Sequence, residues 1–303
     1  MQKEKIKTIV VTGGNGFIGG HLIRRLLSEG YRVINYIREN SPKQNIPQGK
    51  LLINLDYINL EKYIDINKCY AFIHLATNYG RENCYKKIYE SNIELPSKLL
   101  ELLTKADCKI FINTDTFYGK SKNNYAHMTP YINSKKCFVE LSKIFCALNA
   151  EVRVLNFRLE HVYGPMDGSE KFIPKLIEEL KKNKSIELTM GNQERDFIYI
   201  EDVTNAYCIA LKNIEKIQCG YTEYEIGTGV SMPVKEIVKL MKRLIKSSSD
   251  LKFGALPYRD GEIMKSKANI RAISDLGWCV NIETLVGLKS TLITDDKVSS
   301  IIK

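Results

Sequence analysis

A run of glycines near the N-terminus constrains the fold more than any other feature of the sequence. The segment TGGNGFIGG, residues 12–20, follows the apolar run TIVV and precedes a stretch with helical spacing of apolar residues. It fits both G-x-x-G-x-x-G and G-x-G-x-x-G. A bare glycine pattern is weak evidence, but this one stands between a predicted strand and a predicted helix, which is the context that a phosphate-binding turn requires.

The glycine turn predicts dinucleotide binding. Glycines permit a tight turn and a close approach of the backbone to pyrophosphate, and the N-terminus of the following helix presents N–H groups to it. The alternative is a glycine-rich turn with a purely structural role. The residues expected to contact the dinucleotide here are Gly13, Gly16, Phe17, Ile18 and Gly19.

Strand and helix patterns alternate through the first half of the chain. The predicted strands cover residues 8–14, 31–37, 69–76, 108–114 and 151–159, and the predicted helices cover 19–30, 92–107 and 130–150. Thr129 is the expected N-cap of the last helix, with Pro130 at its first position. This alternation predicts an α/β fold with a Rossmann-type, doubly wound parallel sheet covered by helices on both faces.

The pattern loosens after residue 164, where amphipathic helices alternate with short strands. We expect a cofactor-binding domain over residues 1–163, to which the chain returns at about 195–222. A smaller C-terminal α/β lobe is expected over 164–194 and 223–303, and we expect it to bind the substrate. The length of 303 residues is sufficient for such a division.

Composition and charge argue against several classes of protein. No segment approaches 18 consecutive apolar residues, and the N-terminus has no signal-peptide pattern, so we expect a cytoplasmic protein without membrane spans. The eight cysteines are scattered, which predicts reduced thiols and no metal site. The net charge of +10 has two interpretations: the lysines are solvated at the surface, or the positive charge attracts anionic ligands. No arginine-rich stripe with interleaved aromatic residues indicates nucleic-acid binding.

The end of the second predicted strand bears on the choice of dinucleotide. An NAD site usually has an acidic residue there, which bonds the ribose 2′-hydroxyl. This chain has Ile37 and then Arg38, whose guanidinium can pair bidentately with a 2′-phosphate. We therefore expect NADP(H) rather than NAD(H). The alternative is that Arg38 is solvated and Glu39 takes the ribose. Asp56, after LLINL, is expected to accept from the adenine amino group.

Two Tyr-x-x-x-Lys matches occur, and about two are expected by chance. Tyr131 stands at the start of a predicted helix, so Lys135 shares its face one turn further on. Tyr118 and Lys122 are separated by a glycine in a polar loop, where no helix is expected to align them. The lysine charge favours the phenolate, so it is expected to lower the pKa of Tyr131 from its usual value of about 10.

With these motifs the chain resembles the extended short-chain dehydrogenase/reductase superfamily of NAD(P)-dependent nucleotide-sugar epimerases, dehydratases and reductases. The matching segments, in order, are TGGNGFIG, IHLAT, SNIELPSKLLE, NTDTFYG, YINSK, RLEHVYGP, KFIP, RDFIYIEDV, EIGTG and YRDGE. The longer segments HLATNYG, NYAHMTPYINSK and YTEYEIGTG are similar to the ketoreductases that form CDP-abequose and CDP-paratose for O-antigen lipopolysaccharide.

The resemblance implies that Thr114, Tyr131 and Lys135 are catalytic. Tyr131 would donate a proton to the reduced ketone, and Lys135 would also bond the nicotinamide ribose. Thr114 would bond the substrate carbonyl oxygen; the alternatives are a strand-end threonine with backbone hydrogen bonds, and Thr116 as the nearest rival. Further cofactor contacts are implied for Leu75 and Ala76.

Substrate contacts are implied for Thr77, Thr116, His161, Lys171, Arg195 and Arg259. The two arginines align with those that hold the nucleotide diphosphate; the alternative for each is a surface ion pair. His161 replaces the usual asparagine before VYGP and is expected to be a neutral imidazole in the pocket. Asn92 matches a family asparagine beside the active site, or is structural. Asp115 replaces a small residue, and we assign it no role.

These observations predict NADPH-dependent reduction of the 4-keto group of a nucleotide-linked sugar, a CDP-4-keto-3,6-dideoxyhexose. The alternative is an NAD-dependent nucleotide-sugar 4-epimerase with the same catalytic set. A dehydratase usually needs a carboxylate pair after the catalytic hydroxyl, and TDTFYG offers only Asp115. The intact catalytic set also argues against a non-catalytic NADP sensor. A homodimer is expected through the helices near 92–107 and 130–148.

Overall fold

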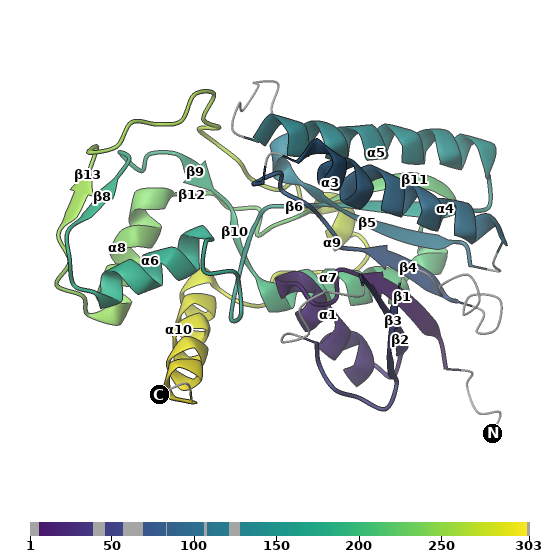
Figure 1. The fold of residues 1–303 in the computed structure, drawn as a ribbon, viewed down its shortest axis with the longest axis horizontal. Coiled ribbons are helices and arrows are strands. Elements are labelled where there is room, and N and C mark those ends of the chain that lie inside the picture. The colour runs from purple at the N-terminus through teal and green to yellow at the C-terminus, as the bar shows by residue number, and fades with distance from the viewer. Residues whose placement is uncertain are drawn as a thin grey trace.

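A seven-stranded parallel sheet forms the larger part of the molecule (Figure 1). The computed structural model describes residues 6–38, 46–56, 69–82, 84–105, 108–120 and 128–301. The strand order is β11-β6-β5-β4-β1-β2-β3, so the chain winds outward from β1 in both directions. The strands are β1 (Thr8–Thr12), β2 (Arg32–Ile37), β3 (Leu52–Asp56), β4 (Ala71–His74), β5 (Ile110–Thr116), β6 (Arg153–Leu159) and β11 (Gly220–Ile226). This confirms the predicted doubly wound Rossmann-type sheet.

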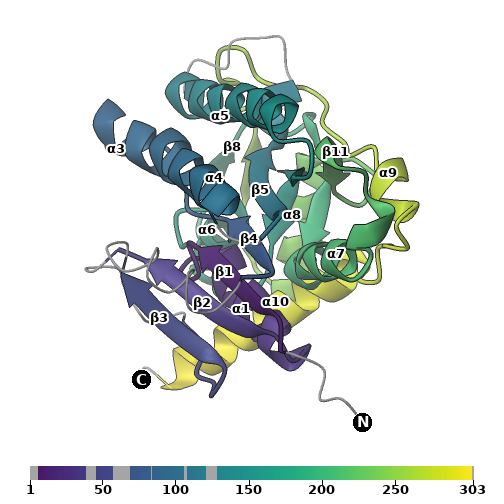
Figure 2. The ribbon, with the colours of Figure 1, turned by 90° about the vertical axis from the view of Figure 1, so that its right-hand side faces the viewer.

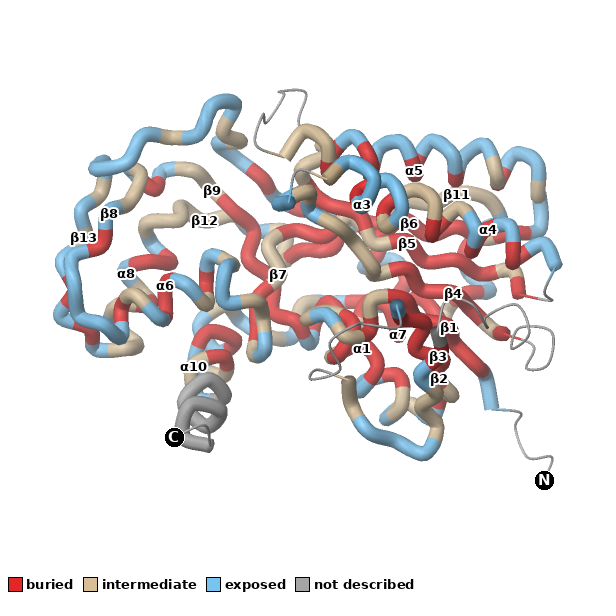
Figure 3. The backbone as a smooth tube through the Cα atoms, viewed as in Figure 1, coloured by how far each residue is buried: buried red, intermediate tan, exposed pale blue. Residues whose placement is uncertain are grey.

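Helices cover both faces of the sheet, as Figure 2 shows. The helices on one face are α1 (Phe17–Ser28), α7 (Ile200–Lys212) and the short α9 (Arg271–Ser274), and those on the other are α4 (Leu95–Lys105) and α5 (Thr129–Leu148). Alternate residues of β1 enter different cores: Ile9 and Val11 pack on the α1 side, and Val10 packs on the α4 side. Because both faces are covered, the inner strands β1, β2, β4, β5 and β6 are almost entirely buried, whereas the edge strands β3 and β11 are partly accessible (Figure 3).

Two helix starts differ from the sequence-based expectation. Helix α5 begins at Thr129 itself, with Met128 at the N-cap, so Thr129 is not the cap residue. Pro130 is therefore the second helical residue and not the first, still within the first turn, where its missing N–H has no partner to lose. The predicted helix 92–107 begins as α4 only at Leu95. It is preceded by α3 (Tyr85–Tyr89) and a π-helical segment, η1 (Glu90–Glu94).

A smaller lobe follows the sheet and lies to its left in Figure 1. It contains three two-stranded sheets and a core in which α6 packs on α8 through Leu176, Leu180, Ile237 and Met241. Its elements are β7 (His161–Tyr163), α6 (Phe172–Lys181), β8 (Ile186–Leu188), β9 (Glu194–Arg195), β10 (Phe197–Tyr199), β12 (Met232–Pro233), α8 (Val234–Ile245), β13 (Leu251–Phe253) and α10 (Thr284–Ile301). None of the helices in the described residues is long and apolar enough to cross a membrane.

The chain returns to the large sheet through α7 and β11, and this return ends a few residues past the expected range of about 195–222. Strand β11 pairs with β6 from Gly220 to Ile226, so the expected boundary at 222 falls inside a strand. The indole of Trp278 is also buried in the core beneath this sheet, and it donates to the carbonyl of Asp202 at 3.0 Å. The assignment of one part to the cofactor and the other to the substrate stays a prediction.

Candidate active site

A cleft of about 610 Å³ lies at the carboxyl ends of the central strands, between the sheet and the lobe. Ligands of open α/β sheets bind at this edge, because loops there are free to vary around a fixed scaffold. Most of the residues predicted from the sequence line it. They are Gly13, Gly16, Phe17, Ile18, Gly19, Arg38, Leu75, Ala76, Thr77, Thr114, Thr116, Tyr131, Lys135, His161 and Lys171.

The glycine turn brings β1, α1 and the loop after β4 into close contact. Gly13 has φ +73°, and a Cβ there would lie 2.6 Å from the backbone nitrogen of Ala76. A Cβ on Gly19 would lie 2.6 Å from Cα of Gly14. Gly16 is the N-cap of α1 and has no side chain to cover the first N–H groups of the helix. This cradle fits the pyrophosphate of a dinucleotide.

The residues expected to select the dinucleotide lie at the ends of β2 and β3. Ile37 is buried, and Arg38 is exposed and lines the cleft. Asp56 is the register partner of Ile37, so β3 ends beside β2. The side chain of Asp56 and the whole of Glu39 lie outside the described residues. An exposed guanidinium at this corner is able to meet a phosphate from solvent.

Helix α5 and strand β5 bring the predicted catalytic residues together. Tyr131 and Lys135 are one turn apart on α5, and both are buried. The ammonium of Lys135 donates a hydrogen bond of 2.9 Å to the carbonyl oxygen of Thr114. The ring of Tyr131 contacts Tyr79 with centroids 5.1 Å apart.

Burial dominates the acid–base properties of this pair. It lowers the pKa of Lys135 to about 8, with Asp115 acting in the opposite direction. It also raises the pKa of Tyr131 well above its usual value, and Tyr79 adds to this shift. The expected lowering of the Tyr131 pKa is therefore absent in this arrangement, in which the Lys135 ammonium bonds the carbonyl of Thr114. At neutral pH the phenol is protonated, as a proton donor must be.

The Thr114 hydroxyl makes its hydrogen bond on the opposite side of the sheet. Its Oγ1 lies 2.7 Å from the phenol oxygen of Tyr207 on α7. Tyr207 is fully buried and sits in the core between α7 and the sheet. Sequence reasoning missed this residue, because a tyrosine on the apolar face of a helix looks like an ordinary core residue.

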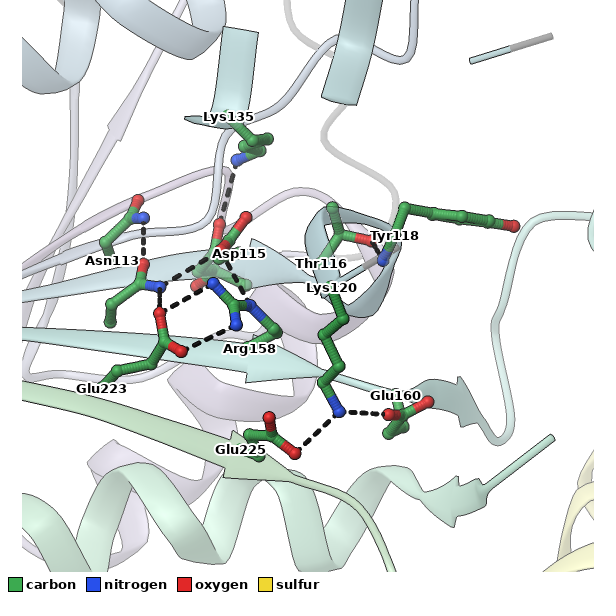
Figure 4. A network of polar contacts seen from close by, with 12 residues as sticks. Asn113, Asp115, Thr116, Tyr118, Lys120, Lys135, Arg158, Glu160, Glu223 and Glu225 are labelled. Atoms are coloured by element: carbon green, nitrogen blue, oxygen red, sulfur yellow. Dashed lines mark hydrogen bonds and ion pairs between the residues drawn. The ribbon is translucent and has the colours of Figure 1, made fainter. Parts of the chain in front are cut away.

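Asp115 belongs to a buried polar network that crosses three strands (Figure 4). Its Oδ2 accepts hydrogen bonds from Nδ2 of Asn156 at 3.1 Å and from Nε of Arg158 at 3.4 Å. Arg158 also pairs with Glu223 at 2.7 Å, and Asn113 donates to Asn156 at 2.7 Å. The network joins β5, β6 and β11, which gives Asp115 a structural role that the sequence did not reveal. Asp115 and Arg158 are neighbours in the register of β5 on β6, which explains their pairing.

A second network in Figure 4 ties the segment after β5 to the lobe side of the sheet. Lys120 ends the 3₁₀ turn η2 (Phe117–Lys120), which also contains Tyr118. Its ammonium donates to Glu160 and to Glu225, each at 2.7 Å. Tyr118 therefore lies in a short turn rather than an α-helix, and its match partner Lys122 lies outside the described residues.

His161 lies on the lobe side of the cleft between two aromatic rings. The ring centroids of Phe117 and Phe197 are 4.3 and 5.6 Å from the imidazole. Burial lowers the pKa of His161 to about 3, and the charges of Arg195 and Lys171 act in the same direction. The imidazole is therefore neutral at physiological pH. Its Nδ1 is buried and has no hydrogen-bond partner within the described part of the chain.

Two charged contacts connect the loop after β4 to the start of α6. The Lys171 ammonium lies 4.0 Å from the centre of the Tyr79 ring, and Arg81 pairs with Glu170 at 2.6 Å. Tyr79 in turn contacts Tyr131. This end of the cleft is therefore bridged by side chains from the loop after β4 and from the lobe.

Asn92, in the π-helical segment, fastens the loop that contains Thr77. Its Oδ1 accepts from the Thr77 hydroxyl at 3.2 Å and from the Asn78 backbone N–H at 2.8 Å. Its Nδ2 donates to Ser134 on α5 at 2.9 Å. Asn92 is buried and outside the cleft lining, so its contacts describe a structural support for the site.

Arg195 and Arg259 do not line the cleft. Arg195 is buried, pairs with Glu262, and donates to the Glu194 carbonyl at 2.8 Å. Arg259 is exposed, and its carbonyl accepts from the backbone N–H of Glu262 at 3.1 Å. Glu262 thus links both arginines at one corner of the lobe. Their role in diphosphate binding stays a prediction.

The chain is similar to known proteins over most of its length. Residues 9–227 match the model of the NAD dependent epimerase/dehydratase family. The chain is 39% identical over 295 residues to CDP-abequose synthase of Salmonella muenchen, covering 94% of this chain and 97% of that protein. It is 29% identical over 304 residues to a putative UDP-glucose 4-epimerase of Methanocaldococcus jannaschii, covering 93% and 96%.

Solved structures show the same fold. An epimerase of Methanothermobacter thermautotrophicus superposes with a TM-score of 0.85 at 20% identity, covering 98% of this chain and 94% of that one. UDP-glucose 4-epimerase of Thermotoga maritima, solved with UDP-glucose, gives a TM-score of 0.82 at 24% identity, covering 96% and 99%. With its glycine cradle, its Tyr131–Lys135 pair and these matches, the chain belongs to the NAD dependent epimerase/dehydratase family.

Proposed function

We propose that this protein is an NADPH-dependent nucleotide-sugar 4-ketoreductase, which reduces a CDP-4-keto-3,6-dideoxyhexose for O-antigen or other surface polysaccharide. The observation that carries the proposal is a buried tyrosine–lysine pair at the cofactor cleft of a chain 39% identical to CDP-abequose synthase. We infer a cytoplasmic location from the chemistry, since NADPH and nucleotide sugars are metabolites of that compartment.

In this proposal the bound dinucleotide supplies a hydride to the ketone carbon. The turn from Gly13 to Gly19 holds its pyrophosphate, Arg38 pairs with the 2′-phosphate, and Lys135 bonds the nicotinamide ribose. Tyr131 donates its proton to the ketone oxygen as negative charge develops on that oxygen. A threonine hydroxyl of β5 keeps that oxygen in place, and Thr114 is the residue we assign.

The lobe side of the cleft suits a nucleotide-linked sugar. Lys171 supplies a positive charge at the start of α6, and the neutral His161 offers an unpaired ring nitrogen. We assign Thr77 and Thr116 to the sugar, and Arg195 and Arg259 to the diphosphate.

An NAD-dependent 4-epimerase remains the alternative function, favoured by the similarity to a putative UDP-glucose 4-epimerase. An epimerase regenerates its cofactor in each cycle and therefore needs no added reductant. A dehydratase is disfavoured by the segment TDTFYG. Its single carboxylate, that of Asp115, is paired with Arg158 and Asn156.

An assay with purified protein tests the proposal. CDP-4-keto-3,6-dideoxyglucose and NADPH are incubated with the protein, the loss of NADPH absorbance is followed, and the sugar is identified by NMR. We expect one NADPH to be oxidised for each ketone reduced. The Tyr131→Phe variant should bind NADPH normally and lose about 10²–10⁴-fold in turnover, the range for loss of a general acid. Turnover of an ordinary UDP- or CDP-hexose without NADPH consumption would contradict the reductase and favour the epimerase.

We also propose a homodimer that pairs through α3, α4 and α5. The outer side of α5 exposes Leu141, Ile144 and Leu148, with 39, 59 and 79% of their surface accessible. Tyr85 and Tyr89 of α3 are 71 and 54% exposed. Large apolar side chains gathered on neighbouring helices mark a surface that another protein covers.

A further inference from the structure

We propose that Tyr207 is a positioning residue, which donates a hydrogen bond to Oγ1 of Thr114 and so turns the Thr114 proton toward the substrate carbonyl oxygen. The inference rests on the proposed function in one respect, since it takes Thr114 as the hydroxyl that contacts the ketone. Thr114 is half-buried and lines the cleft, whereas Tyr207 lies wholly beneath it.

The contact joins two residues that are 93 positions apart in sequence. Tyr207 approaches from α7, on the face of the sheet opposite to α5, and its phenol oxygen lies 2.7 Å from Thr114 Oγ1. Its ring packs on Phe157 with centroids 4.7 Å apart. Phe157 is the register neighbour of Thr114 in β6, so the ring is held directly beside the residue that its hydroxyl bonds.

Physical chemistry favours Tyr207 as the donor. A buried phenol needs a hydrogen-bond partner, and within the described residues its one such contact is Thr114. Burial raises the pKa of Tyr207 above its usual value, so the phenol keeps its proton. The phenol is also the more acidic of the two hydroxyls, and hence the stronger donor.

A threonine hydroxyl that accepts from Tyr207 keeps its own proton free for a second partner. The oxygen has two lone pairs and one O–H, so it is able to accept from below and donate into the cleft. Hydrogen bonds in such a chain polarise one another, which strengthens the donation to the ketone oxygen. The phenol therefore acts on the reaction through Thr114 and does not touch the substrate.

The backbone of Thr114 is fixed from the other face. Lys135 on α5 donates to the Thr114 carbonyl at 2.9 Å. Helices on both faces of the sheet thus hold this one residue, α5 through its carbonyl and α7 through its hydroxyl. Loss of the α7 contact should leave the position of the strand unchanged and free only the rotation of the hydroxyl.

The test is a double-mutant cycle between the two hydroxyls. Tyr207→Phe removes the phenol oxygen and keeps the ring against Phe157. We expect kcat to fall roughly 3- to 10-fold, the effect of one neutral hydrogen bond, while KM and the Kd for NADPH stay within about twofold. In a Thr114→Val background, Tyr207→Phe should have no further effect on kcat. An unchanged kcat in the single variant, or multiplicative losses in the double variant, would overturn the inference.

A matched control removes a similar contact elsewhere. The hydroxyl of Tyr70 donates to the Leu211 carbonyl at 3.0 Å, outside the cleft. Tyr70→Phe should therefore leave kcat unchanged. A fall equal to that of Tyr207→Phe would mean that both variants act through stability, and would contradict a positioning role.

A spectroscopic readout separates this inference from the proposed function. In protein with labelled tyrosine, the Tyr207 hydroxyl proton should give a slowly exchanging NMR signal that Tyr207→Phe abolishes and Thr114→Val shifts. If the wild-type protein fails to reduce the ketosugar, the proposed function fails while this signal still tests the pair. A Tyr207 signal that is identical in the Thr114→Val variant would overturn the inference without reference to activity.

Discussion

At the scale of single residues, burial decides the charge that Lys135 carries. Its side chain is removed from water among Tyr131, Thr114 and the neutral His74, with Asp115 as the nearby negative charge. Desolvation penalises the ammonium, and the carboxylate partly offsets that penalty. The residue therefore titrates close to physiological pH, at about 8, rather than at its ordinary value of 10.5.

The pH profile should show this titration. If the Lys135 ammonium is needed, kcat/KM should fall about tenfold per pH unit above about 8. Asp115→Asn removes the charge that raises the pKa of Lys135, so the alkaline limb should move to lower pH. Because the folded pKa lies below the unfolded value, the contribution of Lys135 to stability rises between pH 8 and 10.5. The titration of Lys135 therefore does not destabilise the folded protein between pH 8 and 10.5. An alkaline limb that Asp115→Asn leaves in place would contradict this assignment.

The prediction of NADP(H) in preference to NAD(H) rests on Arg38. An exposed guanidinium at the end of β2 is expected to pair with the 2′-phosphate, and Arg38→Asp replaces attraction by repulsion. The Kd for NADPH should rise by roughly 10- to 100-fold, the range for a lost charged hydrogen bond, and the Kd for NADH much less. Arg32→Asp, at the opposite end of the same strand, should leave both unchanged. Equal losses for the two cofactors in Arg38→Asp would show that this arginine does not read the phosphate. Titration by fluorescence or calorimetry gives both constants.

At the scale of elements, the turn between β1 and α1 depends on glycine at particular positions. A Cβ on Gly19 would clash first with the Gly13 carbonyl oxygen and would also lie 2.6 Å from Cα of Gly14, whereas a Cβ on Gly16 would be 3.3 Å from its nearest atom, the same Gly13 oxygen. Gly19→Ala should therefore lower the free energy of unfolding by about 1–3 kcal/mol, as overpacking does. Gly16→Ala should cost clearly less, and urea unfolding of both variants compares them. Equal losses would mean that helix packing against the turn does not set the requirement.

The helices and strands also show how much of the fold the sequence pattern predicts. Five of the seven strands of the large sheet were predicted within a few residues, because buried parallel strands give unbroken apolar runs. The two edge strands, β3 and β11, were not predicted. The start of α5 was misplaced by one residue and the π-helical segment before α4 was not expected. The π-helical segment makes contacts with distant parts of the chain, since its Asn92 bonds Asn78 and Ser134. A local sequence window does not contain such partners.

At the scale of the whole molecule, the apolar side of α5 predicts the assembly. Ile144 is 59% exposed near the middle of this surface. Ile144→Glu places a charge in the proposed interface, where it would lose its water without gaining a partner. Sedimentation velocity should show a dimer for the wild type and a monomer for this variant. Leu256→Glu, at a 44% exposed site on the lobe, should remain dimeric. A wild-type monomer at micromolar concentration would contradict the proposal.

The sequence by itself determined the parallel α/β fold and the glycine turn, because these follow from local spacing and side-chain type. Most of the other residues that gather in the cleft were implied by the resemblance of their segments to a known family. Fifteen of the predicted site residues line one cavity, although they come from segments spread over the chain. The tertiary structure decided the rest. Only packing brings Tyr207 to Thr114, pairs Asp115 with Arg158, and buries Lys135 so that its pKa falls. Hydrogen bonds and desolvation act through space, and spacing along the chain does not specify which distant partners fill that space.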